Sequence, residues 1–68
     1  MTVLKVIEIM ASSEKGWEDA ARIAVENAGK TVKGIKSVYV KDMSAVVKDN
    51  KITEFRVNVK ITFEVLTE

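Results

Sequence analysis

Residues 54–65 read Glu54-Phe-Arg-Val-Asn-Val-Lys-Ile-Thr-Phe-Glu-Val65, so polar and apolar side chains alternate through the whole segment. Successive side chains of a β-strand point to opposite faces of its sheet. Unbroken alternation over this length is typical of an antiparallel strand with one buried and one solvated face. The segment predicts a long strand over residues 52–66, in a sheet that is covered on one side only.

A helical pattern lies upstream of this strand. Apolar side chains recur there at intervals of three and four, at Trp17, Ala20, Ala21, Ala24 and Ala28. The spacing predicts a helix over residues 14–32, whose small alanines allow close approach to a sheet and whose Trp17 is an anchor in the core or in an interface. Ion pairs Glu18–Arg22 and Glu26–Lys30 are expected on its wet face.

The helix also has candidate boundary residues. Ser12 or Ser13 is expected to cap its start, because a serine hydroxyl can accept a hydrogen bond from a free backbone N–H of the first turn. Gly34 is expected to end it, because glycine is the common residue after a helix C-terminus.

Two further segments predict strands and complete the topology. Residues 2–10 and 35–48 are rich in β-branched residues, and Asp49-Asn50 suits a tight hairpin between the second and third strands. A strand, a helix and a second strand that runs in the same direction as the first leave one position between the two strands. The last strand fits there, antiparallel to both. We therefore expect one α+β domain over residues 1–68, with the order β-α-β-β and an antiparallel sheet 1-3-2 packed on one helix.

The predicted hairpin is too long for its helix. A strand of about 14 residues spans about 46 Å, whereas a helix of about 19 residues spans about 28 Å. The overhang carries Met43, Ala45, Val46, Val47 and Phe55, and apolar surface of this size typically marks an interaction site. A two-residue loop would place Asp42 and Ser44 on the apolar face. Either they lie in a subunit interface, or a bulge near Asp42 reverses the alternation.

Composition excludes several classes of function. The 68 residues contain no Cys and no His, which excludes disulfides and the commonest zinc ligands and general base. A net charge of +1 gives no basic surface for nucleic acid. No apolar run is long enough to span a membrane, and a cytoplasmic location is expected. A domain this small is marginal alone, so self-assembly is its remaining source of stability.

Candidate ligand-binding residues gather on the sheet face away from the helix. Tyr39 is expected there with Ser37 and Lys41, beside Arg56, Asn58 and Lys60 of the last strand. This surface is either a solvated face with one aromatic ring or a place where a planar ligand stacks at a subunit interface. Acidic residues such as Asp19, Asp42 and Asp49 could bind calcium only from several places together, because no calcium-binding loop is present. No serine has a base partner, so no enzyme is predicted.

The chain resembles the dodecin family over nearly its whole length. The resemblance rests on Val6-Ile-Glu-Ile9, Ser12-Ser-Glu-Lys-Gly-Trp-Glu-Asp-Ala20, Lys30-Thr-Val-Lys-Gly-Ile35 and Asp49-Asn-Lys-Ile-Thr-Glu-Phe-Arg-Val-Asn-Val-Lys-Ile-Thr-Phe-Glu-Val65. It implies a β-α-β-β fold, assembly into a hollow dodecamer, and binding of flavins such as FMN, riboflavin, lumichrome or FAD in pairs, for storage and without catalysis. Ser37 stands where flavin-binding members have a stacking Trp, Arg56 where they have a Gln, and Ser44 where some have a basic residue.

Two hypotheses follow. In the first, a homododecamer stores a small ligand, flavin by resemblance, against Ser37, Tyr39, Arg56 and Asn58; binding of riboflavin or FMN is weak because the Trp and the Gln are replaced. In the second, a flavin-free assembly binds calcium or another metal through carboxylates at symmetry axes, as the resemblance to a branch that includes a calcium dodecin implies. An enzyme or an RNA-binding sheet ranks last, since this face has one aromatic residue.

Overall fold

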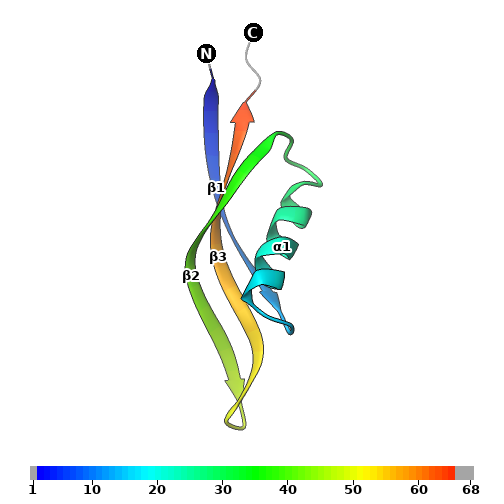
Figure 1. The fold of residues 1–68 in the computed structure, drawn as a ribbon, viewed down its shortest axis with the longest axis vertical. Helices are drawn as coiled ribbons and strands as arrows, with labels where there is room; N and C mark the ends of the chain where they lie inside the picture. Colours follow the sequence, from blue (N-terminus) through cyan, green and yellow to red (C-terminus); the bar gives the residue numbers. More distant parts are fainter. Residues whose placement is uncertain (1, 66–68) are drawn as a thin grey trace.

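The computed structural model describes residues 2–65 and has the predicted order of elements (Figure 1). They are β1 (Val3–Ser13), α1 (Trp17–Ala28), β2 (Ile35–Lys48) and β3 (Lys51–Val65). The strands form one antiparallel sheet in the order β1-β3-β2, and α1 packs on one face of it. The predicted topology is confirmed, and β2 has the predicted bounds. The expected end of the last strand at Leu66 lies outside the described residues. No helix within residues 2–65 is long and apolar enough to cross a membrane.

The core is a thin layer between helix and sheet. Three alanines of α1 meet three β-branched side chains of β3, and the buried set is Ala20, Ala24, Ala28, Val57, Val59 and Ile61. The predicted apolar stripe and the predicted buried face of the last strand are therefore both confirmed. Trp17 is 37% exposed in the single chain and lies outside this layer, so it is not a core anchor.

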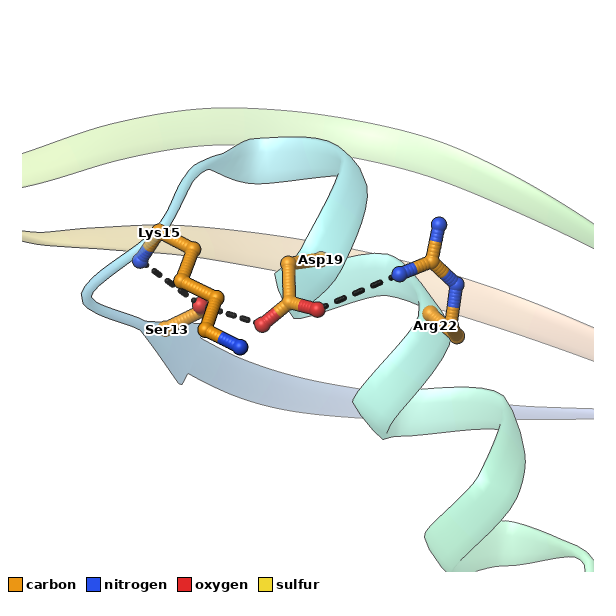
Figure 2. Close-up of polar contacts among 4 residues, drawn as sticks. All are labelled: Ser13, Lys15, Asp19 and Arg22. Atoms are coloured by element: carbon orange, nitrogen blue, oxygen red, sulfur yellow. Dashed lines mark hydrogen bonds and ion pairs between the residues drawn. The ribbon is translucent and has the colours of Figure 1, made fainter.

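The start of the helix differs from the prediction. β1 continues through Ser13, and α1 begins after Gly16 without a side-chain cap. The Ser13 hydroxyl instead donates to Asp19 Oδ2 at 2.6 Å and accepts the Lys15 N–H at 2.9 Å (Figure 2). The prediction that Ser12 or Ser13 caps the helix is wrong, because both residues belong to β1. Ser13 nevertheless ties the end of β1 to the first turn of α1.

The end of the helix is also earlier than predicted. α1 ends at Ala28, so Gly34 is not its stop signal. Gly34 has a φ of 77°, and its carbonyl accepts the Glu64 N–H at 2.9 Å, which joins the α1–β2 loop to β3. Lys30 follows the helix, and the expected pair with Glu26 is not among the ion pairs of residues 2–65.

Arg22 also pairs differently from the prediction. Its guanidinium donates to Asp19 Oδ1 at 3.2 Å and not to Glu18 (Figure 2). Asp19 thus holds Ser13 with one carboxylate oxygen and Arg22 with the other. The expected i, i+4 pair is replaced by an i, i+3 pair, because Asp19 is already fixed next to the end of β1.

The hairpin overhangs the helix as expected. The chain is 54 Å long, and the β2–β3 hairpin continues well past the start of α1 (Figure 1). Asp49 and Asn50 have φ values of 52° and 63°, as a tight hairpin turn requires. Trp17 braces the base of this overhang: its indole N–H donates to the Ser44 carbonyl at 2.9 Å, and its ring meets Phe55 edge-on, with centroids 4.8 Å apart.

A bulge in β2 resolves the question of alternation. Val40 pairs with Val59 and Asp42 with Asn58, so Lys41 is an extra residue in β2. The inserted residue returns Asp42 to the polar face and places Met43, opposite Val57, on the apolar one. The bulge near Asp42 is therefore the correct alternative, and the subunit interface is not needed to explain the pattern.

Candidate functional site

The candidate site is the sheet face opposite α1, here called the outer face. Cross-strand partners share a face, and the registers assign to this one Val6, Glu8, Met10 and Ser12 of β1, Ser37, Tyr39, Asp42 and Ser44 of β2, and Arg56, Asn58, Lys60 and Thr62 of β3. The predicted residues Ser37, Tyr39, Arg56 and Asn58 thus all lie on it. Because β3 is the central strand, each of its residues here has a neighbour on either side.

The four predicted residues lie in different cross-strand rows. Ser37 is opposite Thr62, Tyr39 is opposite Lys60, and Arg56 is opposite Ser44. The rows of Tyr39 and Arg56 are four residues apart along β3, which is about 13 Å. One chain therefore places the phenol ring and the guanidinium at separate positions, with the Asn58 row between them.

Tyr39 is the one aromatic residue among these four predicted residues, and it is well exposed. It is 65% exposed, and its ring borders Lys60 across the strand. Ser37, at the position of the expected stacking Trp, is exposed and offers a hydroxyl but no ring. On the outer face a planar ligand therefore finds one aromatic ring, that of Tyr39, two residues away from the position that the resemblance implies.

Charges on the outer face are partly neutralised across β3. Lys41 Nζ lies 3.3 Å from Glu8 Oε2, so this pair connects the bulge in β2 to the opposite edge strand. Asp42 has no ion pair within residues 2–65. Its register partner Asn58 carries an amide, and Ser44 with its hydroxyl lies in the next row. Asp42, Asn58 and Ser44 therefore form a small group of oxygen-bearing side chains.

Residues 2–65 of one chain do not form a complete metal site. Among the described residues, no three Asp, Glu, His or Cys side chains converge. Calcium takes about six to eight oxygen ligands, which is more than Asp42 and its neighbours supply. A calcium ion on this face would need oxygens from another copy of the chain or from water.

Sequence reasoning missed the β1 residues of the outer face, among them Glu8 and Met10. Glu8 forms the ion pair with Lys41, and Met10 is 64% exposed beside Asn58. The signal was present: Ile7 and Ile9 pack against the core, so their neighbours must face the other way.

Comparisons of the sequence and of the fold with known proteins find the same family. The dodecin family model matches residues 3–66. The calcium dodecin of Mycobacterium tuberculosis is 39% identical over 66 residues, covering 94% of this chain and 90% of that protein. Its crystal structure, described as calcium chelating with a novel calcium-binding site, superposes with a TM-score of 0.82 at 31% identity, covering 97% of this chain and 94% of that one.

A dodecin of Thermus thermophilus, solved as an R45A mutant, superposes even more closely. The TM-score is 0.93 at 25% identity, covering 98% of this chain and all of that one. The two likenesses agree on the fold, and the dodecins they represent are small-ligand-binding proteins without catalytic activity. The expectation of a binding protein and not an enzyme is confirmed, and the chain belongs to the dodecin family.

Proposed function

We propose that this dodecin assembles into a hollow homododecamer that binds calcium, or a similar divalent ion, at sites shared between subunits. The observation that carries the proposal is the group around Asp42, a carboxylate without an ion pair in residues 2–65, opposite Asn58 on an exposed sheet face. The 39% identity to a protein named calcium dodecin supports the choice of ion.

The surface of a single chain supports assembly. Among residues 2–65 the buried hydrophobic set contains six residues, three of which are alanines. Large apolar side chains remain exposed on both edge strands, and they include Leu4, Val6, Met10, Val38, Met43 and Val47. A domain of this size gains stability by burying such side chains against further copies.

The need for shared ligands links the ion to the assembly. Oxygen ligands are the ones that calcium prefers, and Asp42, Asn58 and Ser44 offer them from one chain. Because the described part of one chain lacks a full set, a symmetry-related copy would supply the remainder. The bulge at Lys41 matters here, since without it Asp42 would point toward the apolar face.

Flavin remains the second candidate, favoured by one observation. Tyr39 presents an exposed ring on the outer face. A ring–ring stack is worth about 0.5–1.5 kcal/mol beyond the burial of area, so replacing a Trp by Ser37 should remove a substantial part of the affinity. We expect weak or absent quenching of riboflavin and FMN fluorescence, with FMN favoured if Arg56 reaches its phosphate. Tight riboflavin quenching that persists in Tyr39→Ala would contradict both expectations.

The test combines size with ion binding. Light scattering of the chelator-treated protein should show a particle far larger than the 7.6 kDa chain, and calorimetric titration should show calcium binding. Asp42→Asn should weaken that binding at least tenfold. Asp49→Asn is the matched control, because it makes the same change in the hairpin turn, where asparagine also tolerates a positive φ; its calcium affinity should be that of the wild type.

Each outcome has a separate meaning. A monomer or dimer at micromolar concentration would refute the assembly. Wild-type calcium affinity in Asp42→Asn would remove this residue from the site, and no calcium binding by the large particle would refute the choice of ion.

A further inference from the structure

A second concave site lies on the helix side of the sheet, beyond the C-terminal end of α1. It is a cavity of about 370 Å³ lined by Lys5, Lys33, Gly34, Phe63, Glu64 and Val65. Its size falls in the range of small-molecule sites, about 300–1,000 Å³. Phe63 points to the same side of the sheet as the buried residues Val59 and Ile61, and Lys5 shares that side as the register partner of Phe63. The cavity therefore lies on the helix side of the sheet and is separate from the outer face.

The floor and the rim of this cavity have different chemistry. Phe63 and Val65 are half-buried and give the floor an apolar, partly aromatic surface. Lys5 from β1 and Lys33 from the α1–β2 loop bring two ammonium groups to the rim. Neither lysine forms an ion pair within residues 2–65, so their charges are available to a ligand.

The one acidic residue of the lining does not neutralise these lysines. Glu64 alternates with Phe63 along β3, so its side chain points to the other face of the sheet. There its carboxylate lies 3.6 Å from Lys36 Nζ. The cavity therefore keeps a net positive rim.

The rim is also fixed in place before any ligand arrives. The Gly34 carbonyl accepts the Glu64 N–H at 2.9 Å, which holds the loop against β3. Gly34 has a φ of 77°, which side-chain-bearing residues rarely adopt, and a Cβ there would stand 3.1 Å from the Glu64 carbonyl oxygen, closer than most Cβ contacts, so glycine suits this approach. Preformed concavity with an apolar floor and a few charged groups is typical of a small-molecule site.

We propose that this cavity binds an amphipathic anion, an aromatic or aliphatic body that carries a phosphate or carboxylate group. The apolar body lies on Phe63 and Val65, and the anionic group accepts charge-assisted hydrogen bonds from Lys5 and Lys33. The proposal does not depend on calcium, on flavin or on the outer face.

The test uses 1-naphthyl phosphate as the probe, with calorimetric titration of the assembled protein. The probe should bind at least tenfold more tightly than 1-naphthol, which lacks the charge, and than inorganic phosphate, which lacks the ring. Lys33→Gln and Lys5→Gln should each weaken it about five- to tenfold. Lys48→Gln is the matched control, because Lys48 is an exposed lysine in the hairpin at the opposite end of the sheet.

Four results would overturn the proposal. No binding of the probe would show that the cavity is not a site. Equal affinity for 1-naphthol would exclude a role for the lysines, and equal affinity for inorganic phosphate would exclude a role for the floor. Loss of binding in Tyr39→Ala together with retention in both lysine variants would place the probe on the outer face.

Discussion

Replacing Gly34 with alanine should destabilise the fold, because this glycine joins the α1–β2 loop to β3. Its φ of 77° is one that side-chain-bearing residues rarely adopt, and its new Cβ would press on the Glu64 carbonyl at 3.1 Å. Left-handed backbone costs about 1–2 kcal/mol in a residue with a Cβ, and weakening the hydrogen bond from Glu64 costs about 1 kcal/mol more. We expect the free energy of unfolding to fall by about 2–3 kcal/mol per chain.

Gly29→Ala is the matched control for this prediction. Gly29 follows α1 with a φ of −64°, an ordinary helical value for alanine, and a Cβ there would stand 3.3 Å from the Val25 carbonyl oxygen of the preceding turn. Its free energy of unfolding should match the wild type or rise by up to about 1 kcal/mol, since alanine restricts the unfolded chain. Urea unfolding followed by circular dichroism measures both variants, at one fixed chain concentration because assembly makes stability depend on it. Coincident unfolding curves for the two variants would refute the reasoning about Gly34.

Three further substitutions, one of them with a control variant, test the packing. Trp17→Ala should lower the free energy of unfolding by about 2 kcal/mol, less than for a buried Trp; a loss above about 4 kcal/mol would show that neighbouring subunits bury the ring. Ser13→Ala should cost about 2 kcal/mol, because Asp19 and the Lys15 N–H both lose a partner. Ser12→Ala, on the outer face, should change the free energy of unfolding by less than about 0.5 kcal/mol in the same urea unfolding experiment, and equal losses in the two serine variants would contradict the role of Ser13. Ala24→Leu should cost at least about 1–3 kcal/mol and shift the melting temperature accordingly; an unchanged melt would mean that helix and sheet are not in close contact.

The sequence predicted most of the fold because periodicity reports burial directly. The alternation along β3 and the alanine stripe of α1 describe the two surfaces that meet in the core, and both are found as predicted. The helix ends were predicted less well, since serine and glycine can serve either element. Ser13 remains in β1 because it pairs with Phe55 there, and Gly34 is used to approach β3 and not to end α1.

The sequence predicted which face of the sheet carries the candidate site, but not how its side chains are spaced on that face. Alternation places Tyr39 and Arg56 on the same side of the sheet, but the distance between their rows depends on the register. The orientation of Asp42 depends on one extra residue, Lys41, which no local pattern distinguishes from its neighbours. Lys41 and Glu8 are 33 residues apart in sequence, so only the folded sheet brings the two side chains of this ion pair together.

The alanine stripe of α1 has a consequence for how any ligand can be held. With only methyl groups from Ala20, Ala24 and Ala28 facing Val57, Val59 and Ile61, the two layers leave little interior volume to enclose a guest. A ligand must therefore sit at the periphery of the chain, where the next copy can close over it. Ligand binding and subunit assembly would then be thermodynamically coupled, so that a saturating ligand protects the particle against dissociation on dilution. In such a system the apparent affinity reports the concentration of protein as well as that of the ligand.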